Sequence, residues 1–429
     1  MKGFENMKAI KIVTIFVTVL SIFFGLVLST KHTTDYDGYA GYLKVDGTKV
    51  VDENGKEFII KAMGFSNYCM NYPSTSSSIE NVHHTEASYK ELKEMGFNTV
   101  RFLINYNLFE DDSRPYTYQQ SGFNWIDKNI AWAKKYGLRI ILDMHCPQGG
   151  YQSWDQTNTS NFQSNPDFGG YNEGDALWLI PENQKRLTAL WTKIAEYYAD
   201  EEAIIGFSIV NEPVVAMKGL STNGNYLGTS NSIYTKCMNL YKELMDTTIA
   251  SIRTVDTNHI IFSQRICAYA DPDLDWANWV DVKNLNFVLS SDKNVVYEFH
   301  FYKPGAFSQQ SSSSSYGSGK TYTYERDVLP YLKQYKNFST NNNVPLFAGE
   351  YGLVNACFYS SKGGQQWVED VLSYFIENGI GSAYHMYYGG SSRGYDYGMY
   401  TTWSKINVGS SQRDSNVYNT LKNTLAKYN

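Results

Sequence analysis

The feature that most constrains this chain is a repeated order of helix, glycine and short apolar strand. Residues 89–97 read Tyr-Lys-Glu-Leu-Lys-Glu-Met-Gly-Phe and lead into an apolar run at Thr99, and the same order recurs around Gly137 and Gly379. A glycine at this point is typical of a helix that ends in the left-handed conformation before the chain enters a strand. Repeated units of this kind indicate a parallel sheet covered by helices.

The number of strand candidates favours a closed barrel. Eight apolar, β-branched runs occur beyond Tyr39, at residues 58–63, 99–103, 139–144, 204–210, 259–264, 295–299, 345–349 and 379–386. Residues 182–199 and 233–255 carry apolar side chains at helical spacing, as expected of helices that cover the strands. We therefore predict an α/β fold, a (β/α)8 TIM barrel, with residues 39–429 forming one domain.

The first thirty residues indicate a targeting segment. Lys2, Lys8 and Lys11 precede an apolar run over residues 12–28, which is typical of a secretory signal peptide. The run is long and lacks a clean Ala-x-Ala cleavage site, so an uncleaved membrane anchor over residues 8–30 remains an alternative. In either case we expect the domain to be secreted or to lie outside the cell.

Charge and composition narrow the class of partner. The net charge is −6 and the pI about 5.7, which argues against nucleic acid or an anionic membrane surface, because both need a basic face. Aromatic residues make up 16% of the chain, with 36 Tyr and 9 Trp. Flat aromatic rings can stack on the apolar faces of sugars, although a tyrosine-rich surface of a secreted protein is the simpler interpretation.

The five cysteines are scattered, odd in number and without CxxC spacing, which excludes a disulfide framework or a zinc motif. We expect small buried hydrophobic side chains, with one disulfide and a leftover thiol as the alternative. They are Cys69, Cys146, Cys237, Cys267 and Cys357.

Two carboxylates stand directly after strand candidates. Glu212 follows the strand at 204–210, before Pro213, which is expected to hold it extended, and Glu350 follows the strand at 345–349. The fourth and seventh strands of a barrel face each other across its C-terminal mouth, so the two side chains could flank one glycosidic bond. A separation of roughly 5–5.5 Å implies retention and roughly 6.5–9.5 Å inversion. The alternative is that both are ordinary partners of arginines.

An ordered set of short motifs resembles glycoside hydrolase family 5, the cellulase family, from Tyr42 to about Trp403. The motifs are Val100-Arg101-Phe102, Asp143-Met144-His145, Asn211-Glu212-Pro213, Glu298-Phe299-His300-Phe301-Tyr302 and Gly349-Glu350-Tyr351-Gly352, each at the end of an expected strand. Each is weak alone, but their order is specific. The resemblance implies a retaining β-glycosidase with Glu212 as acid/base, protonated before reaction, and Glu350 as an ionised nucleophile.

Further roles follow from the same resemblance. Arg101 matches the guanidinium that holds the nucleophile ionised and in place. Asn211 matches the amide that hydrogen-bonds the sugar 2-hydroxyl. His145, His300 and Tyr302 match polar residues that line the −1 subsite, the position of the sugar whose bond is cleaved. Each histidine could instead be a satisfied core residue, and two histidines with carboxylates could indicate a metal site, but they lie singly on separate strands, so we expect no metal and no cofactor.

One position departs from the family pattern. The last strand usually carries a tryptophan as the floor of the −1 subsite, whereas His385 stands at that place here, with Tyr387 and Tyr388 as candidate substitutes. Long loops after the strands could supply aromatic platforms, of which we prefer Trp154 and Trp178, with plain packing as the alternative. The other candidates are Tyr68, Tyr72, Tyr106, Tyr151, Tyr171 and Tyr302.

These features favour a monomeric endo-β-1,4-glucanase that acts on a β-linked plant-cell-wall polysaccharide. The alternatives are the same mechanism on β-mannan, xylan, xyloglucan or β-1,3-glucan, which one scaffold can accommodate. A non-catalytic carbohydrate-binding surface protein is an alternative of another class. It has no need of two opposed carboxylates, which argues against it.

Overall fold

The computed structural model of the chain describes residues 38–66, 84–149, 175–218, 232–271, 276–279, 285–310, 322–359, 362–389, 397–401 and 405–429. Residues Tyr36–Asn429 form one compact unit. The expected leader at residues 1–30 lies outside the described ranges. Within those ranges, no helix combines the length and the hydropathy needed to cross a bilayer.

The centre of the fold is a closed barrel of parallel strands, as predicted. Each strand pairs with the next one along the chain, and the last pairs with the first. In chain order the strands are β3 (Lys61–Phe65), β4 (Thr99–Asn105), β7 (Arg139–Cys146), β8 (Ile204–Ser208), β10 (Ile260–Gln264), β13 (Val295–Phe301), β14 (Leu346–Tyr351) and β15 (Gly381–Tyr384).

Two barrel strands start more than one residue away from the predicted start. The first strand was expected at residues 58–63, but the backbone N–H of Phe58 donates to Val50 O at 2.8 Å, so this segment pairs outside the barrel before β3 begins. The last strand was expected to start at Gly379, which has φ +66° and instead follows the preceding helix. Gly96 and Gly137 have φ +99° and +64°, so the predicted left-handed helix ends are confirmed.

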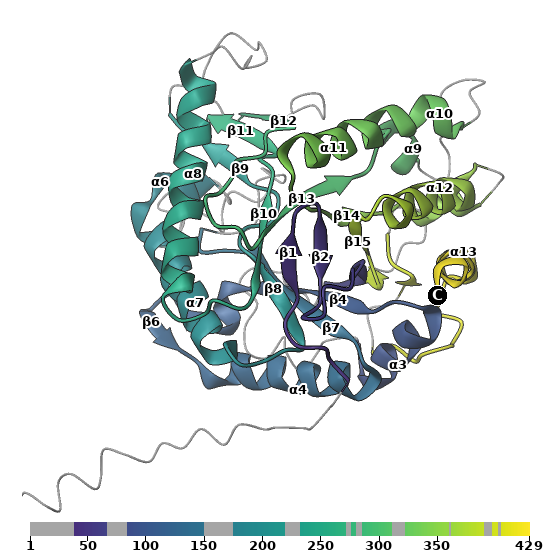
Figure 1. The fold of residues 1–429 in the computed structure, drawn as a ribbon, viewed down its shortest axis with the longest axis horizontal. Helices are drawn as coiled ribbons and strands as arrows, with labels where there is room; N and C mark the ends of the chain where they lie inside the picture. Colours follow the sequence, from purple (N-terminus) through teal and green to yellow (C-terminus); the bar gives the residue numbers. More distant parts are fainter. Residues whose placement is uncertain are drawn as a thin grey trace, which may run out of the picture. The chain divides into compact units, whose positions relative to one another are not determined.

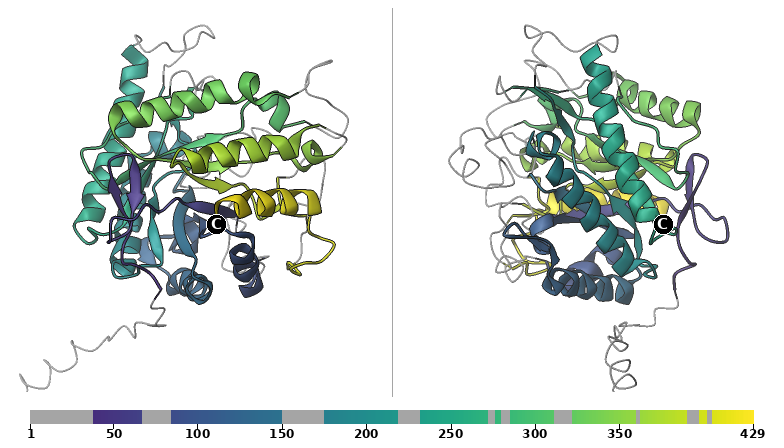
Figure 2. Two further views of the ribbon diagram at one scale, coloured as in Figure 1. Left: turned by 45° about the vertical axis from the view of Figure 1, so that its right-hand side comes forward. Right: turned by 90° about the vertical axis from the view of Figure 1, so that its left-hand side faces the viewer.

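Helices surround the barrel (Figure 1), and Figure 2 shows α11, α12 and α13 in succession along one side. The long helices are α3 (Glu86–Met95), α4 (Gln120–Tyr136), α7 (Pro181–Tyr198), α8 (Ser232–Arg253), α11 (Leu329–Asn342), α12 (Gly364–Glu377) and α13 (Ser415–Leu425). Apolar residues from the outer faces of the strands and from these helices form the main core. This arrangement confirms the (β/α)8 prediction.

The alternation changes between β10 and β13. In place of a long helix, the described residues there form β11 (Ala268–Asp271) and β12 (Trp276–Trp279), an antiparallel pair. β11 also pairs with β9 (Val214–Ala216), which lies just after Glu212. This small sheet therefore braces the segment that carries the expected acid/base.

A hairpin closes the N-terminal end of the barrel. Its strands, β1 (Lys44–Asp46) and β2 (Lys49–Val51), are drawn over the centre of the barrel in Figure 1. Leu43 and Val50 form an apolar cluster with side chains from the barrel strands. The strand residues are Ile60, Ala62, Ile141, Ile205, Ile260, Phe262, Val296, Phe347 and Ala383. This apolar cluster fills the N-terminal end of the barrel, and the polar side chains lie at the opposite end.

Two fully buried tryptophans hold the chain at that polar end. Trp191 on α7 donates its indole N–H to Ile209 O at 2.9 Å, just before Asn211. Trp367 on α12 donates to Lys303 O at 3.0 Å, just after Tyr302. Because a buried donor without a partner costs free energy, these bonds fix both backbone segments against the helices.

The cysteines in the described residues are buried and free, as expected for small hydrophobic side chains. They are Cys146, Cys237, Cys267 and Cys357, and Cys69 lies outside the described ranges.

A substitution at Gly206 can test the close contact between β8 and β10. A Cβ at this position would lie 1.9 Å from Ile260 O, a backbone atom that cannot move aside. We expect Gly206→Ala to lower the free energy of unfolding by about 1–3 kcal/mol or more in urea denaturation. The control is Gly305→Ala in α9 (Gly305–Ser308), where nothing lies within 4 Å and a change within about 0.5 kcal/mol is expected. Equal losses in both variants would contradict the packing argument.

Candidate active site

Arg101 lies at the centre of the polar end of the barrel and is fully buried. Its Nη1 donates to Glu350 Oε1 at 2.9 Å, and its Nη2 lies 2.9 Å from Asp143 Oδ1 and 3.1 Å from Glu298 Oε1. Burial alone lowers the pKa of Arg101, but the three carboxylates outweigh it and raise that pKa further, so the guanidinium stays charged. Arg101 thus holds the expected nucleophile, the task that the motif predicted.

A bulge in β14 turns Glu350 into the barrel. Phe299 pairs with Ala348 and the next residue of β13, His300, pairs with Glu350, so Gly349 is an extra residue in β14. A bulge of this kind re-aims the following side chain. Glu350 therefore faces the barrel axis, with 7% of its side chain exposed.

Glu212 is placed by an unusual backbone conformation. It was expected to be extended before Pro213, but its φ is +39°, in the left-handed region that few residues other than glycine adopt. Its N–H donates to Gln264 Oε1 at 2.7 Å, and Pro213 O accepts the N–H of Cys267 at 2.9 Å. These bonds to the β10–β11 segment hold the turn and leave 15% of the Glu212 side chain exposed.

His300 stands between the two glutamates. Its Nδ1 lies 2.7 Å from Glu212 Oε1 and 3.3 Å from Glu350 Oε2. Burial alone lowers the pKa of His300, but the negative charges of Glu350 and Glu212 outweigh burial and raise that pKa to about 10. At neutral pH the ring is therefore an imidazolium that attracts both carboxylates.

The charge around Glu350 favours its ionised form. Burial raises the pKa of Glu350, but nearby cations outweigh burial and hold that pKa well below its usual value. His385 contributes little at neutral pH because burial lowers the pKa of His385 below 6.5, so Arg101 and His300 are the effective cations. Tyr302 donates its hydroxyl to Glu350 Oε2 at 2.7 Å, and burial raises the pKa of Tyr302, which keeps that proton in place.

Asn211 and His145 form a chain of polar contacts beside Arg101. Asn211 Oδ1 accepts from Arg101 Nη2 at 2.8 Å, and its Nδ2 lies 3.5 Å from His145 Nε2. His145 Nδ1 lies 2.9 Å from Asp143 Oδ2, which fixes the ring. The structure brings both residues to the centre, as predicted, and orients the Asn211 amide.

His385 and two tyrosines form the wall next to Glu350. His385 Nδ1 lies 3.7 Å from Glu350 Oε1. Tyr302 and Tyr397 present their rings edge-on to His385, at 6.4 Å and 5.9 Å between centroids. Tyr397 was not anticipated, since it lies in a polar segment without a strand pattern.

Several predicted aromatic platforms are core residues. Tyr387 is fully buried and donates its hydroxyl to Glu91 on α3 at 2.8 Å, so it points away from Glu350 and does not replace the missing tryptophan. Tyr388 is also buried in the main core. Tyr106 is fully buried too, with its hydroxyl 2.8 Å from Asp112 Oδ1. A platform needs an open ring face, so these assignments are wrong.

Trp178, in α6 (Asp175–Leu179), is 5% exposed and packs 6.1 Å from the ring of Tyr241 on α8. This position favours the packing alternative for Trp178. The remaining candidates lie outside the described residues, namely Trp154, Tyr68, Tyr72, Tyr151 and Tyr171.

Three supporting residues were not predicted as site residues, although two of them stand in the quoted motifs. Asp143 and Glu298 contact Arg101, and Gln264 holds the backbone of Glu212. Their position within β7 and β13 and at the end of β10 was the available signal, because a polar side chain inside a barrel needs a partner.

One cluster in the described part of the chain has the geometry for a metal ion. Glu212, His300 and Glu350 each offer an atom within 4.8 Å of the others. With the pKa of His300 raised to about 10, its Nδ1 carries a proton where a metal would bind. Binding of a metal ion there would therefore require the loss of that proton.

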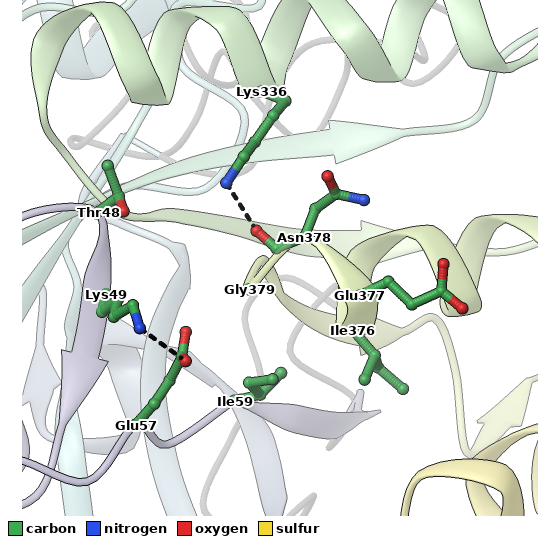
Figure 3. A pocket seen from close by; sticks show the side chains of 9 residues that line it. All are labelled: Thr48, Lys49, Glu57, Ile59, Lys336, Ile376, Glu377, Asn378 and Gly379. Carbon is green, nitrogen blue, oxygen red and sulfur yellow. Dashed lines mark hydrogen bonds and ion pairs between the residues drawn. The ribbon is translucent and has the colours of Figure 1, made fainter.

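A cavity of about 480 Å³ lies at the opposite, N-terminal end of the barrel (Figure 3). It is lined by residues from β2, α11 and α12, among them Lys49, Lys336 and Gly379. Its cations already have partners, since Lys49 Nζ lies 3.1 Å from Glu57 Oε2 and Lys336 Nζ donates to Asn378 O at 2.9 Å. Its two carboxylates, Glu57 and Glu377, are likewise engaged, by Lys49 and by the hydroxyl of Tyr428.

Removal of Arg101 should expose its electrostatic role. We expect Arg101→Met to lower the free energy of unfolding by about 3–5 kcal/mol, because Asp143, Glu298 and Glu350 are left buried without their cation. Urea denaturation at pH 7 measures the loss. The exposed Arg114 provides the control, and Arg114→Met should change stability by no more than about 0.5 kcal/mol.

The low pKa of Glu350 predicts a specific pH dependence of stability. Since the pKa of Glu350 is lower in the folded protein than the unfolded value of 4.5, its ionised form stabilises the fold above pH 4.5. That contribution is lost as pH falls below 4.5. The difference in unfolding free energy between wild type and Glu350→Gln should therefore shrink between pH 6 and pH 3. Parallel curves would contradict the assignment.

Comparison with known proteins places the chain in a family. A family model described as cellulase (glycosyl hydrolase family 5) matches residues 51–391. Endoglucanase C of Acetivibrio thermocellus is 25% identical over 331 residues, 70% of this chain and 82% of the relative, and an endoglucanase of Paenibacillus polymyxa is 24% identical over 91% of both chains. The crystal structure of the endoglucanase Cel5A from Thermotoga maritima superposes with a TM-score of 0.56 at 19% identity, covering 84% of this chain and 96% of that one. The chain belongs to glycosyl hydrolase family 5, the cellulase family, and is a glycosidase that hydrolyses O-glycosyl bonds.

Proposed function

We propose that this glycosidase cleaves a β-1,4-glucan internally, with retention of anomeric configuration, by double displacement. The observation that carries the mechanism is the distance between the two glutamates. One carboxylate oxygen of Glu212 lies within 4.8 Å of one of Glu350, and both carboxylates contact the same nitrogen, His300 Nδ1, which favours the shorter separation of a retaining pair. An inverting enzyme needs roughly 6.5–9.5 Å to admit a water molecule, whereas a retaining pair stands roughly 5–5.5 Å apart.

The charges divide the work between the two residues. Glu350, ionised beside Arg101 and His300, attacks the anomeric carbon, while Glu212 protonates the leaving oxygen. The resulting glycosyl ester on Glu350 is then hydrolysed by water, with Glu212 as the base. Glu212 suits the proton transfers because its side chain is the more exposed of the two.

Asn211 is suited to stabilise the transition state. Arg101 holds its oxygen, so its amide hydrogens face the region near His145 and the sugar. A hydrogen bond to the sugar 2-hydroxyl strengthens as the oxocarbenium ion forms, which lowers the barrier. Tyr302 orients Glu350 Oε2 from the other side of the carboxylate.

The relatives support a β-1,4-glucan as substrate. They include proteins named endoglucanase and cellodextrinase, which align over 70% and 69% of this chain. A β-xylosidase and a glucan 1,3-β-glucosidase align over 40% and 30%, so xylan and β-1,3-glucan, with β-mannan and xyloglucan, remain the alternatives. A non-catalytic carbohydrate-binding surface protein is disfavoured because the whole set around Arg101 is present. We also propose export through residues 1–30, since polysaccharides are met outside the cell.

Activity on a panel of polysaccharides tests the substrate. We expect reducing sugar from β-1,4-glucan to exceed that from mannan, xylan, xyloglucan and β-1,3-glucan, with an early fall in viscosity that indicates internal cleavage. Glu350→Gln should lower kcat by about 10³-fold or more, because no nucleophile remains. If another glycan of the panel is cleaved faster, that glycan is the substrate. If none of the glycans is cleaved, the proposed function is contradicted.

Azide rescue separates the two carboxylates. With an aryl β-cellobioside that carries a good leaving group, azide should restore turnover of Glu212→Ala and give a β-glycosyl azide, because the ester on Glu350 still forms. With Glu350→Ala, azide should give the α-glycosyl azide. Proton NMR identifies both products, and exchanged anomers would reverse the roles.

A further inference from the structure

Glu298 is a buried carboxylate for which the reaction itself has no use. Inward positions alternate along β13, so Val296, Glu298 and His300 face the barrel axis in successive layers. Glu298 is fully buried. It cannot reach the cleaved bond directly, since His300 and the glutamates lie above it.

The surroundings of Glu298 are built to hold a charge. Ser208 on β8 donates its hydroxyl to Glu298 Oε2 at 2.6 Å, and Arg101 lies 3.1 Å from Oε1. Gly349 leaves room for the carboxylate, because a Cβ there would lie 1.8 Å from Oε1. Burying an ionised carboxylate is costly, so contributions from β8, β4 and β14 to one acidic group indicate a role.

The charges at the centre require a second cation. Asp143, Glu298 and Glu350 surround the single guanidinium of Arg101. His300 supplies the missing positive charge, with Nδ1 toward Glu212 and Glu350, and Nε2 at 3.7 Å from Glu298 Oε1. In the described residues Nε2 has no hydrogen-bond partner, so Glu298 is the anionic group on that side of the ring.

We propose that Glu298 is a positioning residue whose buried negative charge keeps both ring nitrogens of His300 protonated. The inference rests on the proposed function. A charged ring donates from Nδ1 to Glu212 and Glu350 at once, whereas a neutral ring can turn a lone pair toward them. When Glu350 becomes an ester, the imidazolium remains as the counter-ion of Glu212, which then acts as base.

The other charged groups around His300 cannot substitute for Glu298 in keeping the ring protonated. His300 is faced by Glu212 after β8, Glu350 on β14 and His385 on β15, besides Glu298 on its own strand. The glutamates change charge during the cycle, and His385 is neutral at pH 7. Glu298 takes no part in the proposed proton transfers, and its contact with His300 adds to the raised pKa of that ring.

The test is a titration of His300 by histidine ¹H–¹⁵N NMR in the full chain, with the signal assigned from the spectrum of His300→Asn. We expect the pKa of His300 near 10 in wild type and lower by about one unit or more in Glu298→Gln, which keeps the shape and removes the charge. The matched control is Glu91→Gln. Glu91 is also a buried carboxylate, 2.7 Å from Arg413, but it lies on α3 away from His300, and its loss should leave that pKa unchanged.

Kinetics provide the second readout. Glu298→Gln should lower kcat by about tenfold with little change in KM, and should move the alkaline fall of kcat to lower pH, because the imidazolium is lost earlier as pH rises. Glu298→Asp, which retains the charge, should recover most of this loss, and also serves if the glutamine variant does not fold. In that case the pKa of His300 in Glu298→Asp should lie below the wild-type value, because the shorter side chain places the charge farther from the ring.

An unchanged His300 titration in Glu298→Gln, or an equal change in Glu91→Gln, would overturn the inference. A uniform loss of kcat at all pH values, with the alkaline fall of kcat at its wild-type pH, would also overturn it. That result would indicate that Glu298 has a purely structural role. The NMR titration needs no substrate. Wild type that cleaves no glycan would therefore contradict the proposed function while the titration still decides the role of Glu298.

Discussion

Arg101 holds one positive charge inside the barrel with carboxylates from β7, β13 and β14 around it. Each partner alone would be costly to bury, and the guanidinium would be costly without them. The mutual need fixes Glu350 in its ionised form and orients Asn211 through the same nitrogen that contacts Asp143. Glu212, in contrast, is placed by Gln264 and by the backbone at Cys267.

Packing outside the barrel keeps the charged centre in place. The indoles of Trp191 and Trp367 bind backbone oxygens next to Asn211 and Tyr302, so helices α7 and α12 brace the loops that carry them. Gly349 acts twice, because its bulge turns Glu350 inward and its missing side chain leaves space for Glu298. The site is therefore built on strands and braced turns, which favours a rigid arrangement.

His300 links the two halves of the reaction. It contacts both glutamates through one nitrogen, so in the proposed double displacement its charge attracts the nucleophile before the first step and the base before the second. His385, whose pKa is lowered by burial, stands beside Tyr302 and Tyr397, at the position where the resemblance to the family leads us to expect a tryptophan. These three side chains form the wall of the site next to Glu350.

The sequence by itself determined the barrel, through the glycines that end helices and the eight apolar runs, and it predicted the chemistry that we propose, because motifs at strand ends single out Glu212, Glu350 and Arg101. These signals are local. Only the tertiary structure decided the conformation of Glu212, the burial of Tyr387 and Tyr106, and the contacts of Glu298 and Tyr397. Each depends on partners far away in the chain, such as Gln264 for Glu212 and Glu91 for Tyr387, and spacing along a strand does not reveal which partner a side chain meets.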